Sequence, residues 1–588
     1  MKAKGMVKTM KKILLVALNA KYIHSNPAVY CLKAYAAEYQ EQIEIAEYTI
    51  NQQTDEILRD IYKRKPDVIA FSCYIWNITS VLELVGELGQ IAPHIPLFLG
   101  GPEVSYNAEE LLEKYTELTG ILVGEGEEVF LKLVAYYVDK LGALKDIKGL
   151  VCREQENSVL PVQTTAVFDK LPFLYGSAEV GSKLPQEFAN RILYYESSRG
   201  CPFSCSYCLS SIDKKVRFRE LETVKKELAY FLENQVAQVK FIDRTFNAKK
   251  AHAMEIWQFL KEHDNGVTGF HFEIGADLLG EEELELLTSL RVGQVQLEIG
   301  VQTTNPDTLK AICRHADMKR LKENVLQLQK ARKSMLHLDL IAGLPYEDLE
   351  SFKHSFDEVY SWQPDELQLG FLKVLKGSPM HDKKAEYGLC YKSVPPYEVL
   401  STKWLSYEDI CVLKGVEEML ELYYNSKQFV HSLRFLSHFF SSSFAMYEVL
   451  AAYYEEKGYD ARSLNRLHRY EILEQFVCAE SSVLVLTEEQ KEAFRELLVY
   501  DLYLREKIKS RPDFAGVPLE RKEQNEWLRQ MQKEPDKGVR LHVEAFLYDR
   551  ESAEQFGTCI KREHIVVFDY TERNVITLEC KTEELRVV

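Results

Sequence analysis

Two successive series of short apolar segments, each followed by a polar stretch of helical period, constrain the fold of this 588-residue chain more than any other feature. In the first series the segments read "KKILLVALN", "IEIAEYTI", "PDVIAFSCY", "IPLFLGG" and "GILVGEG". Apolar runs of this length that alternate with helices are typical of parallel strands buried on both faces. We therefore predict an α/β fold that begins with a Rossmann-like domain over residues 11–140.

The ends of these strands indicate a ligand site, because open parallel sheets bind ligands beyond the carboxyl ends of their strands. They read "NAKYIHSN", "SCYIWN", "GGPEVS" and "GEGEE". Glycine lets a backbone approach a ligand closely, and the glycines here are Gly100, Gly101, Gly124 and Gly126. No G-x-G-x-x-G follows the first strand, so nothing points to a dinucleotide. Each glycine also has the alternative reading of an ordinary turn at a strand end.

After a predicted linker over 141–190, with "NSVLPVQ" and "KLPFLYGS", the second series begins at "RILYYESSRGC". Its strands read "ILYYESS", "VKFIDRTF", "GFHFEIG", "VQLEIGVQ", "LHLDLIAGLP" and "ELQLGFLKVL". Six βα units predict a partial (β/α)6 barrel over 191–385, with its chemistry at the strand carboxyl ends. Polar residues recur at those ends, although each taken alone is more often structural: Asp243, Arg244, Asn247, Glu273, Glu298, Gln302, Asp339, Gln368 and Lys373.

Three cysteines, Cys201, Cys205 and Cys208, follow the first strand of this barrel in a Cys-x3-Cys-x2-Cys run. Such a group can hold zinc, form a redox pair, or bind an iron-sulfur cluster with one iron left open. A zinc knuckle needs a fourth ligand at close spacing, and no Cys or His follows closely after Cys208. Twelve cysteines scattered over a chain of this size do not suggest a disulfide framework.

Length and charge narrow the class further. A length of 588 residues, 46% of them hydrophobic, predicts two to four domains. The sequence contains no run of about 20 apolar residues that would predict a membrane span. We expect a cytoplasmic protein. The net charge of −17 argues against a broad nucleic-acid-binding surface, although Lys214, Lys215, Arg217 and Arg219 form a local basic patch that could contact phosphate.

With both series in view, the chain resembles cobalamin-binding radical S-adenosylmethionine (SAM) enzymes. The signature of that superfamily is matched by Cys201, Cys205 and Cys208, with Tyr207 as its usual aromatic residue. The resemblance implies that these thiolates bind three irons of a [4Fe-4S] cluster and that SAM chelates the fourth. Reductive cleavage of SAM then gives a 5′-deoxyadenosyl radical, and an electron donor such as flavodoxin or ferredoxin is implied as a partner.

The resemblance also makes the first domain, residues 11–140, a cobalamin-binding domain, because "LNAKYIHSNPA" and "GGPEVS" are similar to corrin-facing loops. It implies cobalamin contacts at Asn19, Tyr22, Ser25, Gly100, Gly101, Gly124 and Gly126. The Asp-x-His-x-x-Gly motif of some cobalamin proteins is absent, so His24 is not expected to bind cobalt. For SAM, the expected partners are Glu298, Gln302 and Lys373.

The implied reaction is methyl transfer to an unactivated carbon of an unidentified substrate, with nucleic acid not excluded. Two alternatives within the superfamily stay open. One is a cobalamin-dependent rearrangement or cyclisation without methyl transfer. The other is a methylthiotransferase, whose second cluster would have to use Cys31, Cys73 and Cys152. A non-catalytic cobalamin or iron-sulfur sensor is a third class, disfavoured by the polar residues at the ends of six barrel strands.

Residues 386–588 carry no motif with assignable chemistry and resemble a tail of unknown role on some cobalamin radical SAM proteins. We expect this tail to cap the barrel and help select the substrate. Its periodicity predicts helices over about 395–530, with aromatic faces that pack as core. Two alternating segments, "VRLHVEAFLYD" and "HIVVFDYTERNVITLE", predict strands of a small terminal sheet.

Overall fold

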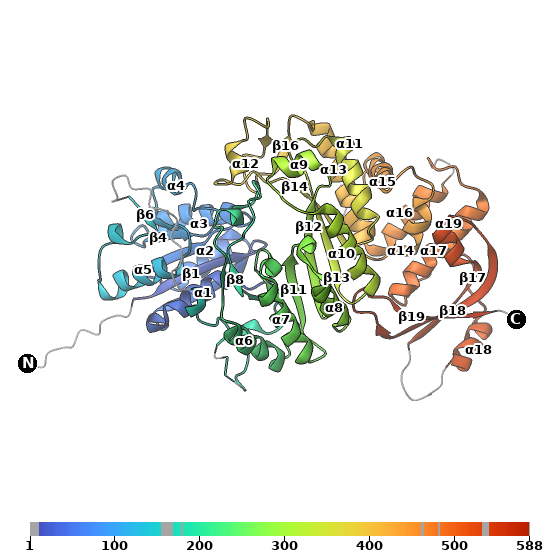
Figure 1. Cartoon of the computed structure of the whole chain (residues 1–588), viewed down its shortest axis with the longest axis horizontal. Coiled ribbons are helices and arrows are strands. Elements are labelled where there is room, and N and C mark those ends of the chain that lie inside the picture. The colour runs from blue at the N-terminus through green and yellow to red at the C-terminus, as the bar shows by residue number, and fades with distance from the viewer. Residues whose placement is uncertain are drawn as a thin grey trace, which may run out of the picture. The chain divides into compact units, whose positions relative to one another are not determined.

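The computed structural model of the chain (Figure 1) describes residues 11–153, 168–176, 178–179, 181–459, 464–479, 483–531 and 540–586. The segment "NSVLPVQ" of the predicted linker lies outside these residues. Backbone packing divides the chain into two compact units. The first consists of Met1–Val295, Ile312–His315 and Leu372–Leu400, and the second of Gln296–Ala311, Ala316–Phe371 and Ser401–Val588.

The first unit opens with a doubly wound sheet whose strand order is β2-β1-β3-β4-β5-β6. All five predicted strands form, as β1 (Ile13–Asn19), β2 (Ile43–Thr49), β3 (Val68–Ser72), β4 (Leu97–Gly100) and β5 (Leu118–Leu122). They are parallel, and β6 (Leu150–Cys152) adds an antiparallel edge. The helices between them are α1 (Pro27–Tyr35), α2 (Thr54–Lys63), α3 (Ile78–Ile91), α4 (Ala108–Lys114) and α5 (Glu127–Asp139).

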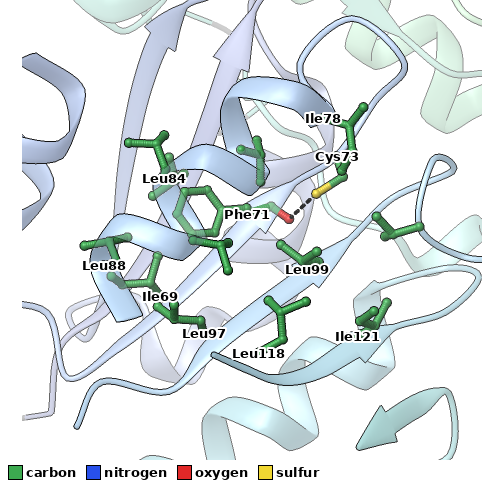
Figure 2. Packing of buried hydrophobic residues seen from close by; sticks show 14 of the residues in the cluster. Ile69, Phe71, Cys73, Ile78, Leu84, Leu88, Leu97, Leu99, Leu118 and Ile121 are labelled. Carbon is green, nitrogen blue, oxygen red and sulfur yellow. Dashed lines mark hydrogen bonds between the residues drawn. The ribbon is translucent and has the colours of Figure 1, made fainter. Parts of the chain in front are cut away.

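Burial on both faces explains why these strands read as continuous apolar runs. All seven residues of β1 are buried. Leu14, Val16 and Leu18 pack into one hydrophobic cluster with α2 and α3, whereas Ile13, Leu15 and Ala17 pack into another with α1 and α5. Figure 2 shows part of the first cluster, including Leu84 and Leu88 of α3 beside strands β3 and β4. The Rossmann-like domain is therefore confirmed.

The six strands predicted for the barrel all form, three in each unit. In the first unit, β7 (Leu193–Tyr195), β10 (Gln238–Phe241) and β11 (Gly269–Ile274) are parallel neighbours. In the second unit, β12 (Val295–Gln302), β13 (Met335–Ala342) and β14 (Glu366–Phe371) are parallel neighbours. The helices of this series are α6 (Leu221–Glu233), α7 (Lys250–Glu262), α8 (Glu281–Ser289), α9 (Pro306–Ala311), α10 (Met318–Ala331) and α11 (Leu349–Tyr360).

Short elements complete the first unit. The strands β8 (Ser198–Arg199) and β9 (Arg217–Phe218) pair antiparallel, as do β15 (Cys390–Tyr391) and β16 (Val399–Ser401). The helix α12 (Pro379–Asp382) precedes β15. The sequence periodicity did not predict these strands, because a strand of two or three residues is too short to show a period.

The C-terminal region is mostly helical, as predicted. Its helices are α13 (Tyr407–Met419), α14 (Val430–Ser437), α15 (Ser443–Lys457), α16 (Arg466–Cys478), α17 (Glu488–Arg505) and α18 (Arg521–Met531), and the π-helix η8 (Leu420–Asn425) continues α13. Phe444, Tyr447 and Tyr454 of α15 are buried, so the aromatic face is core as predicted. The backbone amide of Phe444 donates to Asp357 Oδ1 of α11 at 2.7 Å, which ties these helices to the second half of the strand series.

A small antiparallel sheet ends the chain (Figure 1), in the order β17-β18-β19. The two predicted strands form as β17 (Leu541–Tyr548) and β18 (Lys561–Arg573), with α19 (Arg550–Phe556) between them. The third strand, β19 (Cys580–Arg586), was missed, because residues 581–584 of "CKTEELR" are four consecutive polar residues with no apolar alternation. No helix within the described ranges is long and apolar enough to cross a membrane.

Candidate functional site

The loop that carries the three cysteines is closed at its base by the paired strands β8 and β9. The amide of Cys201 donates to the carbonyl of Asp213 at 3.0 Å. Gly200 has a φ of +100°, and a Cβ there would lie 2.7 Å from the carbonyl oxygen of Lys215. Only glycine fits this position, so the chain can turn sharply just before the first thiol.

The thiols are held close together inside this loop. Cys201 and Cys205 are 9% and 8% exposed, and Cys208 is half-buried. The Ser211 hydroxyl contacts the carbonyls of Cys205 and Cys208 at 2.9 and 2.7 Å. Burial raises the pKa of the Cys201 thiol, and the neighbouring Cys208 and Cys205 raise it further. Arg314 Nη1 lies 3.8 Å from Cys205 Sγ, where its charge stabilises a thiolate.

These residues fit the predicted [4Fe-4S] cluster. Among the described residues, no three Cys, His, Asp or Glu side chains converge on a point where one metal ion could sit. A cubane cluster does not require this, because each thiolate binds a different iron. What it requires is three neighbouring, partly buried thiols, and the loop supplies them. The ligand roles of Cys201, Cys205 and Cys208 stay predictions.

The other cysteines proposed for a second cluster lie in separate surroundings. Cys73 is buried in the core beside β3, where Sγ lies 3.6 Å from the carbonyl oxygen of Phe71 (Figure 2). Cys152 is in the edge strand β6, and Cys31 of α1 lies 3.7 Å from Glu127. The methylthiotransferase alternative therefore gains no support from their placement.

Two of the polar residues at strand ends hold neighbouring backbone in place, and one of them, Asp243, does so at the strand that leads into the cysteine loop. Asp243, fully buried after β10, accepts hydrogen bonds from the Ser197 amide at 3.0 Å and from the Ser197 and Ser198 hydroxyls at 2.6 Å. Burial raises its pKa to about 6. Asn247 exchanges two hydrogen bonds of 2.9 Å with the backbone of Gly275. Both side chains are used within the fold.

A cavity of about 510 Å³ lies at the carboxyl ends of the first sheet, within the first unit. Gly100, Gly101, Gly124 and Gly126 all line it, as their position at strand ends predicted. Leu209, Ser210 and Asp213 of the cysteine loop line it too, with Arg244 after β10. Residues 171–174 of the predicted linker, which the sequence did not mark as functional, form another wall. The cavity is within the usual size of a small-molecule site.

Ion pairs join the glycine loop "GEGEE" to the cysteine loop beside this cavity. Arg217 pairs with Glu125 and Asp213, and Arg199 pairs with Glu127 at 2.9 Å and Glu196 at 2.8 Å. The predicted phosphate-binding patch is therefore wrong for two of its four residues, since Arg217 is paired here and Arg219 is buried against Glu227 at 2.6 Å. Arg244, by contrast, is exposed and forms no ion pair with any described residue.

Three residues predicted to contact the corrin do not line this cavity. Asn19 is buried and its amide donates to Glu47 at 2.9 Å and to the His24 carbonyl at 3.2 Å. Ser25 is buried 3.5 Å from the carbonyl of Ile192, and Tyr22 is 75% exposed beneath the Arg191 guanidinium. His24 Nδ1 lies 2.7 Å from the Tyr194 hydroxyl. Contact of this loop with cobalamin remains a prediction.

The three residues expected to bind SAM are found in different settings. Gln302 ends β12 at a bulge with a φ of +74°, and its side-chain oxygen is buried without a hydrogen-bond partner among the described residues. Such an oxygen fits a ligand N–H donor. Glu298 lies on the same face of β12, and Lys373 is an exposed residue of the first unit. Their roles are likewise untested predictions.

The sequence analysis missed a histidine on this face of the second unit. His337 Nε2 lies 3.1 Å from Asp339 Oδ1 and 3.1 Å from Gln368 Oε1, and Nδ1 lies 3.9 Å from Glu366 Oε2. Burial lowers the pKa of His337, but Asp339, Glu366 and Glu298 outweigh it and raise that pKa to about 9. The alternation in "LHLDLIAG" places His337 and Asp339 on one face, and this signal could have found the pair.

The second unit should lose stability at alkaline pH, because His337 stabilises it only while the imidazole is charged. A histidine whose folded pKa is about 9 contributes its full stabilisation below its unfolded pKa of 6.5 and loses it as the pH rises to 9. Each pKa unit is worth about 1.4 kcal/mol, so the loss is at most about 3 kcal/mol. Urea unfolding of the wild type and of His337→Gln at about pH 6 and about pH 9.5 measures it. The difference in unfolding free energy between the wild type and His337→Gln should be smaller at about pH 9.5 than at about pH 6. An equal difference at both pH values would contradict a charged His337.

Comparisons with known proteins agree with this arrangement. A family model described as the B12 binding domain matches residues 13–134, and one described as the radical SAM superfamily matches residues 195–359. The chain therefore contains a B12-binding domain followed by a radical SAM domain. A third family model, "Protein of unknown function (DUF4080)", matches residues 385–584. The first two domains agree with the predicted cofactor set, which is cobalamin for one and a [4Fe-4S] cluster with SAM for the other.

Curated relatives of this radical SAM enzyme match it over part of their length. The cobalamin-dependent radical SAM methyltransferase TokK of Streptomyces tokunonensis is 25% identical over 356 residues, 56% of this chain and 50% of TokK. The anaerobic magnesium-protoporphyrin IX monomethyl ester cyclase of Cereibacter sphaeroides is 24% identical over 347 residues, 57% of this chain and 55% of the cyclase. The chain thus spans about half the length of these relatives.

Solved structures confirm the predicted fold class. The cobalamin-dependent S-adenosylmethionine radical enzyme OxsB, with aqua-cobalamin and S-adenosylmethionine bound, gives a TM-score of 0.57 at 14% identity, covering 84% of this chain and 79% of OxsB. The radical S-adenosylmethionine methyltransferase TsrM from Kitasatospora setae, with tryptophan and a SAM analogue bound, gives 0.51 at 17% identity, covering 64% of this chain and 76% of TsrM. At these identities the likeness shows the fold alone.

Proposed function

We propose that this enzyme is a cobalamin-dependent radical SAM methyltransferase that acts on an unactivated carbon of its substrate. The observation that carries the proposal is the shared cavity, where strand-end glycines of the B12-binding domain and residues of the cysteine loop line one space. A B12 group and a SAM-binding cluster would then serve the same substrate. The methyltransferase TokK supports the methyl transfer, because its match covers 56% of this chain.

When bound, the cluster supplies the electron that cleaves SAM to a 5′-deoxyadenosyl radical, and cobalamin supplies the methyl group. The chain's own residues hold the parts in place. Cys201, Cys205 and Cys208 would bind iron, and Asp243 would fix the strand that leads into their loop. Gly100 and Gly101 would let the corrin approach the backbone, and Glu298, Gln302 and Lys373 would contact SAM. An electron donor such as flavodoxin or ferredoxin is needed.

The test is anaerobic turnover of the enzyme loaded with iron, sulfide and cobalamin, using SAM that carries a deuterated methyl group. Incubation with cell extract should give an extract component that gains this methyl group, together with S-adenosylhomocysteine and 5′-deoxyadenosine. Mass spectrometry detects all three. If 5′-deoxyadenosine forms and no deuterated methyl group leaves SAM for another molecule, the methyltransferase proposal is wrong and the radical SAM assignment stands.

A second candidate is a radical rearrangement or cyclisation without methyl transfer. Its support is the match to the magnesium-protoporphyrin cyclase over a similar length and identity. In that case the same incubation should yield 5′-deoxyadenosine without S-adenosylhomocysteine. Cobalt and iron contents would be unchanged, at about one cobalt and four irons per chain, whereas a methylthiotransferase would carry about eight irons and no cobalt.

We expect that His24→Ala leaves both the amount of bound cobalamin and its visible spectrum unchanged. His24 does not line the cavity, and its Nδ1 is engaged by Tyr194 at 2.7 Å. Burial lowers the pKa of His24, with help from Lys21 and Lys240. The absorption spectrum of the cobalamin-loaded variant checks this, with Tyr194→Phe as the matched variant that removes the same hydrogen bond. A shifted cobalt spectrum in His24→Ala alone would mean that this imidazole binds cobalt.

A further inference from the structure

The second unit contains a cavity of about 370 Å³ that none of the predicted cofactor-binding residues line. One side is formed by the loops before β13 and β14, through Arg332 and Asp365. The other side is formed by the C-terminal region, through the π-helix η8, helix α14 and the turn between β18 and β19. No function is assigned to that region by its family model. The volume is within the range of sites for small molecules.

Three tyrosines, Tyr360, Tyr423 and Tyr424, contribute to the walls of this cavity, and each hydroxyl is already bonded inside the protein. Tyr424 donates to the Pro364 carbonyl at 2.5 Å, and the hydroxyls of Tyr360 and Tyr423 meet those of Tyr447 and Tyr454 at 3.1 and 2.5 Å. The half-buried Tyr360 and Tyr424 therefore offer ring surface and not hydroxyl groups, whereas Tyr423 is fully buried behind the wall. A planar or apolar body would pack against the two half-buried rings.

The π-helix is the element that carries Tyr423 and Tyr424. It spans Leu420–Asn425 and continues α13 without a break. Its last residue, Asn425, is anchored on β14, where its side chain exchanges two 3.0 Å hydrogen bonds with the backbone of Leu367. Because π-helices are rare and recur at functional sites, this wall is a second reason to expect a ligand here.

Lys427 supplies the polar contact of the cavity. It lies two residues after the π-helix and is half-buried. Its Nζ donates to the Ile576 carbonyl at 3.0 Å, and no carboxylate of a described residue pairs with it. An ammonium carries three N–H donors, so two remain for a ligand. Burial lowers the pKa of Lys427, although Asp365, Glu366 and Glu579 oppose that change. An anion in the cavity would stabilise the charged form.

The charges of the lining indicate which anion fits. The cations are Lys427, Arg332 and Arg434, and the carboxylates are Asp365 and Glu579. Each arginine uses one nitrogen in an ion pair, Arg332 with Asp365 at 3.4 Å and Arg434 with Glu554 at 3.2 Å. Asp365 and Glu554 therefore compensate the two arginines, and Lys427 is the cation of the lining that forms no ion pair with a described residue. Its single charge matches a singly charged carboxylate better than a doubly charged phosphate.

We propose that this cavity binds a small organic carboxylate with a planar or apolar body, held by Lys427 and stacked against the tyrosine rings. The site lies where the C-terminal region of unknown function meets the loops before β13 and β14, and the proposal does not depend on the methyltransferase reaction.

The test uses benzoate as the probe, with the neutral benzyl alcohol and inorganic phosphate as comparisons, on the full-length protein. Isothermal titration should show benzoate binding and a dissociation constant at least tenfold weaker for Lys427→Met. Benzyl alcohol should bind at least tenfold more weakly than benzoate, because it lacks the charge. Phosphate should also bind at least tenfold more weakly than benzoate, because it lacks the apolar body. Lys457→Met, which removes an exposed lysine of α15, is the matched control and should bind benzoate like the wild type.

A second variant separates loss of the ligand from loss of the fold. Val430→Phe adds bulk to the cavity lining without changing any charge, and it should also weaken benzoate binding at least tenfold. Far-UV circular dichroism of each variant should match that of the wild type. The proposal fails if benzoate does not bind the wild type, if Lys427→Met binds it equally well, or if phosphate binds as tightly as benzoate.

Discussion

Replacing Cys201, Cys205 or Cys208 with serine is expected to remove most of the bound iron and all SAM cleavage. A serine hydroxyl is a poor ligand for iron in such clusters, where thiolates are the usual protein ligands. The three thiols share one closed loop, and the loss of any one leaves an iron without its ligand. Anaerobic reconstitution of each variant, followed by iron and sulfide analysis and assay of 5′-deoxyadenosine, measures both effects.

The matched control is Cys411→Ser. Cys411 is an exposed cysteine of α13 in the second unit, so the same substitution there should change neither iron content nor SAM cleavage. It is a better control than Cys313, whose neighbour Arg314 contacts the thiol of Cys205. Retention of SAM cleavage in any of the three loop variants would show that the substituted cysteine is not a cluster ligand.

Gly100→Phe is expected to lower bound cobalt from about one per chain to less than about a tenth, while the iron content stays unchanged. Gly100 lines the cavity and pairs in register with Leu122, which also lines it. A Cβ at position 100 would meet nothing closer than Leu122 Cβ at 3.4 Å, so the fold tolerates the start of a side chain. A phenyl ring beyond that Cβ would occupy the space that a corrin needs. Cobalt and iron are read separately by elemental analysis of the reconstituted protein.

The choice of Gly100 over Gly101 decides whether this experiment can be interpreted. Gly101 has a φ of +122°, and a Cβ there would lie 2.4 Å from the Cys73 carbonyl oxygen. Valine at 101 would therefore distort the domain whether or not cobalamin binds. Gly86→Phe is the control, because position 86 of α3 has open space around it. Normal cobalt in Gly100→Phe would place the corrin elsewhere, and lost cobalt in Gly86→Phe would indicate general damage.

The strands could be predicted from the sequence because their burial on both faces makes each one a continuous apolar run. Ile13–Asn19 is the clearest case, with every residue buried. The strand-end glycines of the candidate site followed from the same reasoning, since parallel strands end at one edge. What the sequence could not show is how distant segments meet. The linker residues 171–174 reach the cavity, and Lys427 faces Ile576 across 149 positions.

Local periodicity also failed where an element is short or consists mainly of consecutive polar residues. The paired strands β8 and β9 have two residues each, and β19 contains four consecutive polar residues at 581–584. The polar residues at barrel strand ends looked alike in sequence. The structure distinguishes structural from ligand-competent residues among them. Asp243 accepts hydrogen bonds from Ser197 and Ser198, whereas Gln302 has a buried oxygen without a hydrogen-bond partner among the described residues.

The ion pair between Glu125 and Arg217 has a consequence for how this protein can evolve. The two residues are 92 positions apart, and their side chains are only 15% and 14% exposed. Loss of Glu125 leaves Arg217 with Asp213 as its other partner, and loss of Arg217 leaves Glu125 with Arg199 at 3.5 Å, so either loss removes one interaction from a partly buried charge network and is destabilising. Neutral drift at either position alone is therefore disfavoured. In homologous sequences these two positions should covary, so the glycine loop and the cysteine loop would diverge together and not independently.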